Sequence, residues 1–141
     1  MTALAASRST PQMGTSTVPD TLSMPMKASS KVYAGGIVVL SSGYAKAGAT
    51  AASLIAVGVA EEDVDNTSGG NGDLNVRVRQ GVFKFVNSGA DPVAQADVGA
   101  DVYIVDDQTI AKTSNSSARS RAGKLVKFES TGVWVQIGIG L

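Results

Sequence analysis

A strict alternation of apolar and polar side chains in the segment 74–79 limits what this chain can fold into more than any other feature. Every second residue there is apolar, at Leu74, Val76 and Val78. A period of two is typical of a β-strand with one buried face, because successive side chains of a strand point to opposite sides. A polar, glycine-rich stretch at 64–73 precedes the strand and indicates a long turn. The sequence therefore predicts a half-buried strand whose outer side carries Asn75, Arg77 and Arg79.

Short strand patterns continue along most of the chain. The run 37–40 is continuously apolar, which is typical of a strand buried on both faces. Polar turns at 106–108 and 130–132 each separate two apolar segments, and each predicts a hairpin. We expect one helical turn at 93–98 and a bend or bulge at 80–81. About nine or ten short strands at such close spacing predict an all-β fold, a small antiparallel β-sandwich or barrel.

Residues 1–30 differ in composition from the rest of the chain. They hold all four methionines and three of the four prolines, with many serines and threonines. Since proline disfavours helices and central strands, we expect an extended N-terminal arm at 1–30 and a β domain at 31–141. Two interpretations of the arm stay open, a disordered terminus or an arm that becomes ordered on a partner as an added strand. In the second interpretation the apolar contacts are Leu22, Met24 and Met26.

The charge balance and the missing residue types argue against several classes of function. The chain has 12 basic and 12 acidic residues, whereas a protein dedicated to nucleic acid usually has a basic excess. It contains neither cysteine nor histidine, which removes disulfides, thiol chemistry and the most common general base and metal ligand. We see no signal peptide and no apolar run long enough to cross a bilayer, and we expect synthesis in a cytoplasm without a membrane partner.

Two loops resemble binding motifs without fulfilling them. The acidic segment 61–66 places Asp63 and Asp65 at the first two ligand positions of a calcium loop, but the required glycine and glutamate positions hold Ser68 and Leu74. The glycines that follow lead into a strand, whereas a phosphate-binding loop opens a helix. The serines have no histidine to activate them. We expect no enzyme activity, no metal and no cofactor, and we interpret the acidic segment as a solvated loop, with pairing to basic groups on a neighbouring subunit as its alternative role.

Basic residues and the single tryptophan are the candidate contact residues. One basic group, expected on one face of adjacent strands, is Arg77, Arg79 and Lys84. A second basic group is Arg119, Arg121, Lys124 and Lys127. Such groups are usually solvated surface, and the alternative is an interface that docks on acidic patches of a partner. Trp134 is either a core residue or an exposed anchor, since tryptophan is enriched at binding hot spots.

Four segments taken in order carry a resemblance to a known family. They are Ala-Gly-Gly-Ile-Val at 34–38, Ile-Ala-Val-Gly-Val-Ala at 55–60, Val-Arg-Gln-Gly-Val-Phe-Lys-Phe at 78–85, and the stretch from Asp-Val-Gly-Ala at 97–100 to Gly-Val-Trp-Val at 132–135. With these segments the chain resembles the capsid cement, or head decoration, proteins of tailed bacteriophages. The resemblance covers most of the β part and leaves the N-terminal arm outside it.

The resemblance implies a jelly-roll or tulip-like β-domain on the outer surface of an icosahedral virion capsid. It implies that the protein bridges neighbouring copies of the major capsid protein and stabilises the expanded shell against internal DNA pressure. It also implies a homodimer or homotrimer at symmetry axes, with no direct contact to nucleic acid. The alternative function is a carbohydrate- or receptor-binding β-module of a virion tail or fibre, for which the candidate aromatic platforms are Tyr33, Tyr44, Tyr103 and Trp134.

Overall fold

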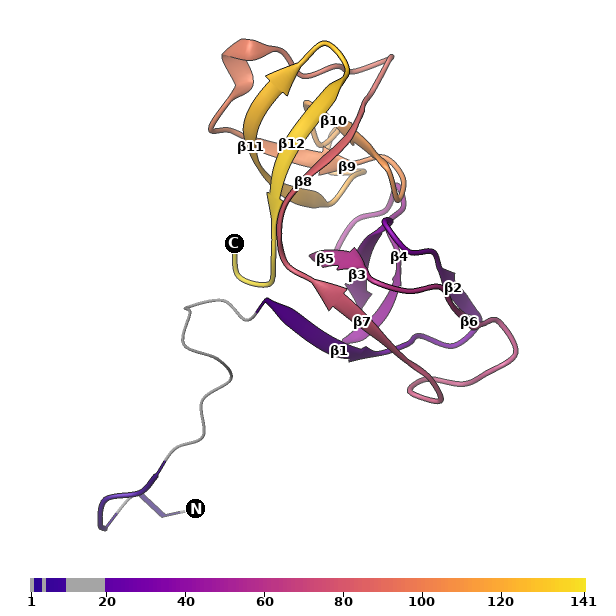
Figure 1. The fold of residues 1–141 in the computed structure, drawn as a ribbon, viewed down its shortest axis with the longest axis vertical. Helices are drawn as coiled ribbons and strands as arrows, with labels where there is room; N and C mark the ends of the chain where they lie inside the picture. Colours follow the sequence, from indigo (N-terminus) through magenta and orange to yellow (C-terminus); the bar gives the residue numbers. More distant parts are fainter. Residues whose placement is uncertain (1, 4, 10–19) are drawn as a thin grey trace.

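The computed structural model describes residues 2–3, 5–9 and 20–141. The described residues form twelve strands and one short 3-10 helix, arranged as two lobes that meet where β7 passes into β8 (Figure 1). The elements are β1 (Thr21–Pro25), β2 (Ser30–Val32), β3 (Ile37–Ser41), β4 (Tyr44–Ala47), β5 (Ile55–Ala60), β6 (Val64–Asn66), β7 (Asn75–Arg79), β8 (Gly81–Asn87), η1 (Gln95–Asp97), β9 (Asp101–Ile104), β10 (Thr109–Ala111), β11 (Arg121–Glu129) and β12 (Gly132–Ile137).

The first lobe is an antiparallel sheet with the strand order β1-β7-β5-β3-β4. A two-stranded ribbon of β2 and β6 accompanies it. Its two edge strands meet through an isolated parallel bridge between Met26 and Ala45, where the backbone N–H of Lys27 donates to the Ala45 carbonyl at 2.8 Å. The sheet therefore curls back on itself, and β1 is the strand that completes it.

The second lobe is a closed barrel with the order β10-β8-β12-β11-β9. Its pairs are antiparallel except for β8 and β10, which run parallel. Closure leaves no free sheet edge within this lobe. The predicted hairpins and the predicted helical turn are all present, as β9–β10, β11–β12 and η1. The expected bend at 80–81 is the point where the chain crosses from the sheet to the barrel.

Two clusters of buried side chains form the core, and β3 contributes to both. Ile37 and Val39 join the cluster that fills the barrel, and Val38 joins the cluster inside the sheet. All three are fully buried. This confirms the prediction that the apolar run 37–40 is a strand with two buried faces, and its physical reason is that β3 lies between the two lobes.

Strand β7 confirms most of the predicted alternation. Val76 and Val78 are fully buried, while Arg77 and Arg79 are exposed. Leu74 differs from the prediction, because it precedes the strand and 45% of its surface is exposed. The inward face of this strand is therefore made by two valines.

Two glycines allow strands to approach more closely than a side chain would permit. A Cβ atom on Gly58 of β5 would lie 2.3 Å from the Arg79 carbonyl oxygen, and one on Gly123 of β11 would lie 1.9 Å from the Gln136 carbonyl oxygen. Both contacts are with backbone atoms, which cannot rotate away. Gly58 therefore marks a place where the backbones of β5 and β7 lie close together.

The fold class is as predicted, a small all-β protein with antiparallel sheets and a barrel. The arm differs from the prediction. We placed the boundary between arm and domain after residue 30, but β1 belongs to the sheet and Met26 is fully buried in the core. The part of the arm between residues 10 and 19 lies outside the described residues. No helix in the part of the chain that the structure describes could span a membrane.

Candidate interaction surface

Strand β1 and the residue that follows it carry the three apolar residues that we predicted as contacts for a partner. It pairs in antiparallel register with β7 of its own chain, and Leu22 and Met24 are half-buried there. Met24 packs on the core of the sheet, and Met26 lies inside that core. The alternation is therefore accounted for by the protein's own sheet, and the most buried of the three residues, Met26, has no surface left for a partner.

The first basic group is divided between the two lobes. Arg77 and Arg79 lie on the outer side of β7, where they form ion pairs of 3.5 Å and 4.0 Å with Glu62 and Glu61. Lys84 lies on β8 of the barrel. The acidic segment thus pairs with a neighbouring strand of the same chain, whereas the alternative role that we considered for it was pairing with a neighbouring subunit. Both arginine side chains stay more than half exposed, at 63% and 56%, so these pairs contribute little to stability.

Trp134 lies half-buried on the outer face of β12, directly across from Lys84 of β8. Its indole N–H donates a hydrogen bond to the Glu129 carboxylate, and this bond lowers the pKa of that carboxyl. The Lys84 ammonium lies 6.0 Å from the centre of the indole ring and donates to the Thr131 hydroxyl at 2.7 Å. Trp134 is consequently a surface residue with a fixed orientation and does not belong to the barrel core.

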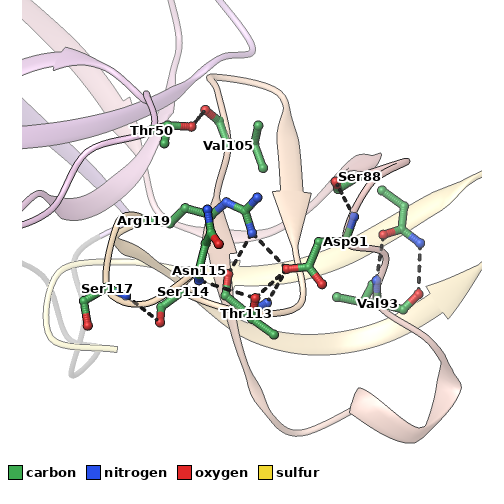
Figure 2. Close-up of polar contacts among 11 residues, drawn as sticks. Thr50, Ser88, Asp91, Val93, Val105, Thr113, Ser114, Asn115, Ser117 and Arg119 are labelled. Carbon is green, nitrogen blue, oxygen red and sulfur yellow. Dashed lines mark hydrogen bonds and ion pairs between the residues drawn. The ribbon is translucent and has the colours of Figure 1, made fainter.

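Arg119 is held inside the chain, which differs from the expectation that it docks on a partner. Its guanidinium donates to the Asp91 carboxylate at 2.8 Å and to the Thr113 carbonyl at 3.1 Å, as Figure 2 shows. The Thr113 hydroxyl also donates to that carboxylate at 2.6 Å. The Thr113 hydroxyl and then Arg119 hold the pKa of Asp91 below its usual value. Only 13% of the Arg119 side chain is exposed. Its guanidinium therefore serves as an internal contact that links the loop at Asp91 to the loop at Thr113.

The remaining basic residues on β11 also have partners within the chain. Arg121 and Lys124 both lie 2.8 Å from the same Asp101 oxygen, and Arg121 also donates to the Leu141 carbonyl. Lys124 and Arg121 together lower the pKa of Asp101. Lys127 is 3.9 Å from a carboxylate oxygen of Glu129. The second basic group is therefore neutralised residue by residue and forms no continuous positive patch.

Three exposed valines lie near Trp134, beyond its direct cross-strand neighbours Lys84 and Lys127, and the sequence reasoning missed this group. Val82 and Val86 point outward from β8 with 44% and 51% of their surface exposed, and Val126 of β11 is 45% exposed. The β8–β12 register pairs Trp134 with Lys84, so the two β8 valines are its diagonal neighbours on the same face. Val126 sits at the irregularity where β11 passes Trp134. The segment 82–86 contained a signal for this group, because its outward positions, Val82 and Val86, are apolar as well as its inward positions, Phe83 and Phe85.

A shallow hollow of about 320 Å³ lies where two turns of the two lobes meet. Its lining residues are Tyr33, Ala34, Gly35, Gly36, Asp107 and Gln108. An adjoining hollow of about 270 Å³ shares Gly35 and Gln108 and reaches Lys84. Within 21–141, Asp107 is the acidic residue whose carboxylate has no hydrogen bond or ion pair in the described structure. The sequence had shown Asp107 only as part of a hairpin turn.

The loops that resembled binding motifs do not assemble a metal site. Over the described residues no three acidic, histidine or cysteine side chains come together as a metal site requires. Asp65 instead accepts bonds from the backbone N–H and the hydroxyl of Thr67, which lower its pKa. Asp73 accepts a bond from the backbone N–H of Gly70 and stabilises the glycine turn.

Comparison with known proteins adds no relative. No family model, no curated protein and no solved structure matches the chain.

Proposed function

We propose that this protein is a capsid cement protein of a tailed bacteriophage. In this role it binds the outer surface of the icosahedral head, bridges neighbouring major capsid protein subunits and stabilises the expanded shell. The order of the four family-like segments supports the proposal. The structural observation that carries it is the outer face of the barrel, where Val82, Val86 and Val126 lie near the oriented Trp134.

Exposed apolar side chains grouped around a tryptophan are typical of a protein–protein contact. Lys127, one of the two cations directly opposite Trp134, is paired with Glu129 within the chain, and the other, Lys84, donates to the Thr131 hydroxyl and forms no ion pair among the described residues. A modest contact of this kind is sufficient on a capsid, because many copies bound to one lattice act together. A site that is complete only when shell subunits are correctly placed also stabilises that arrangement by mass action.

The alternative, a carbohydrate-binding module, has less support. Two of its four candidate aromatic platforms already have a lysine ammonium over the ring, at 4.9 Å for Lys31 on Tyr33 and 6.0 Å for Lys84 on Trp134. A sugar ring that stacked on the same faces would have to displace these cations.

The test is co-sedimentation with heads that lack the protein, in the expanded form and as unexpanded precursors. We expect saturable binding to expanded heads. Val126→Glu should weaken that binding by about tenfold, because it places an unpaired charge in the apolar contact. The matched control is Leu74→Glu, since Leu74 is equally exposed, at 45%, but precedes β7 in the other lobe. Absence of binding to either form of head contradicts the proposal.

A further inference from the structure

The hollow between the 33–36 turn and the 107–108 turn has the features of a site for one cationic side chain. Asp107 lines it with a half-buried carboxylate that has no partner among the described residues. All the remaining carboxylates within 21–141 accept at least one hydrogen bond or form an ion pair. A partly desolvated, unpaired carboxylate is costly, and it is stabilised when a cation binds.

The walls of this hollow are fixed by the backbone. The Ile37 N–H donates to the Asp107 carbonyl at 2.8 Å, and the Gly36 N–H donates to the Tyr33 carbonyl at 3.0 Å. The Asp106 carboxylate accepts the N–H of Gln108 at 2.9 Å and holds the turn that presents Asp107. A site whose walls are held in this way loses little conformational entropy when a ligand enters.

Glycine keeps space open beside the carboxylate. A Cβ atom on Gly36 would lie 3.3 Å from an Asp107 carboxylate oxygen and 3.2 Å from the Tyr33 carbonyl oxygen. A side chain at this position would crowd the approach to Asp107. The Tyr33 ring, 54% exposed, forms the outer rim.

The chemistry favours arginine over other cations. A guanidinium can give two parallel N–H bonds to the Asp107 carboxylate, which the single ammonium of a lysine cannot. The adjoining hollow has the opposite charge, because Lys84 lines it, and it repels a cation. These features confine a positive side chain to the hollow that contains Asp107.

We propose that this hollow binds an arginine side chain of the partner protein on which the domain docks. The inference rests on the proposed function, because the partner is then a shell subunit. It adds a second contact to the apolar barrel face, one that supplies orientation through charge and geometry.

The first experiment measures binding to expanded heads. Asp107→Asn should weaken binding by about tenfold or more, since it removes a charge-assisted pair. The matched control is Asp20→Asn, which changes net charge equally at an exposed carboxylate before β1. Equal affinities of Asp107→Asn and the unaltered protein overturn the inference and leave the cement function standing.

The second experiment needs no heads. N-acetylarginine amide is titrated into the isotopically labelled protein, with N-acetyllysine amide for comparison. We expect saturable NMR shift changes for the backbone amides of Gly35, Gly36 and Gln108, larger with the arginine compound and absent in Asp107→Asn. Such changes without head binding would support the arginine site and reject the cement function. Absence of these changes in the unaltered protein overturns the inference.

Discussion

The two lobes close in different ways. The barrel of β8 to β12 closes through backbone pairing between every neighbouring pair of strands. The sheet of β1 to β7 closes through one bridge, Met26 to Ala45, and its last strand comes from the segment richest in methionine and proline. The barrel is thus made from consecutive strands, whereas the sheet is completed by a strand from the N-terminal end of the chain.

This difference shows that composition is a poor guide to where a domain begins. The segment 21–26 looks like part of an arm, but its apolar residues fill the open side of the sheet. Proline is tolerated because Pro25 stands at the end of an edge strand, where a missing N–H costs little. The following predictions test whether the sheet depends on β1 as strongly as the barrel depends on its own closure.

Removal of residues 1–30 should have the largest effect. It takes away β1 and leaves the buried faces of Val76 and Val78 open to water. We expect loss of cooperative unfolding in the sheet, measured by circular dichroism melting and by hydrogen exchange at β3, β5 and β7. A chain beginning at Asp20 is the control, because it retains every described strand. Equal melting curves for the two truncations would contradict the assignment of β1 to the fold.

Met26→Ala tests the same closure with one side chain. Truncation of a fully buried methionine should reduce the free energy of unfolding by about 2 to 4 kcal/mol. Met24→Ala is the comparison and should cost less, because Met24 is only half-buried. Chemical denaturation of both variants measures the difference, and a larger loss for Met24 would mean that the bridge is not the critical contact.

Alanine at the close-packed glycines should disrupt one lobe at a time. Gly123→Ala places a Cβ against the β12 backbone, and Gly58→Ala places one against the end of β7. Each should destabilise by about 2 to 4 kcal/mol, because a backbone contact cannot relax without moving a strand. Gly89→Ala is the control, since a Cβ there meets no atom within 4 Å. Hydrogen exchange should localise the damage to the barrel in the first variant and to the sheet in the second.

The ion pairs of Arg119 and Arg77 should differ in their contribution to the free energy of unfolding, because the first is more deeply buried. Arg119→Ala should cost about 2 to 3 kcal/mol, because it leaves the Asp91 carboxylate partly buried without its cation. Arg77→Ala removes an exposed pair and should change stability by less than about 0.5 kcal/mol. Denaturant titration of both variants measures this. Comparable losses would show that burial of the pair does not decide its contribution.

Low pH should cause the smallest loss of stability, and this loss should arise mainly in the barrel lobe. The pKa of Asp91 and that of Asp101 are lowered by folding, so each contributes stability above the ordinary carboxyl pKa of about 3.9 that is lost as the pH falls through the lowered value. We expect the melting temperature to fall below about pH 4. Asp91→Asn should show a smaller fall. An equal fall in this variant would assign the acid sensitivity to other groups.

Much of the architecture could be predicted from local pattern. The alternation on β7, the two hairpins and the bend at 80–81 depend on residues close together in sequence, and the period of two is a direct consequence of strand geometry. The doubly buried β3 was visible in its unbroken apolar run. These features need no knowledge of distant contacts.

The contact residues could not be predicted in the same way. Whether Arg119 is free or paired depends on Asp91, which a separate loop brings within 2.8 Å. The availability of Asp107 is likewise a property of the folded neighbourhood, since its neighbour Asp106 is used by the turn. The sequence shows which charged side chains can form ion pairs. Only the tertiary structure shows which of them already have a partner within the chain.

The position of β1 also has a consequence for the order of folding. This strand is synthesised first, but its partner β7 follows only after five other strands, so the sheet cannot be completed until that much of the chain has been made. Pairing over such a sequence separation has a large loop-closure entropy and slows folding. Until β1 has paired with it, β7 presents an open edge that a β1 from another molecule could occupy. Dilution during refolding should therefore raise the yield of monomer, while the barrel, whose strands are nearly consecutive, should form independently of concentration.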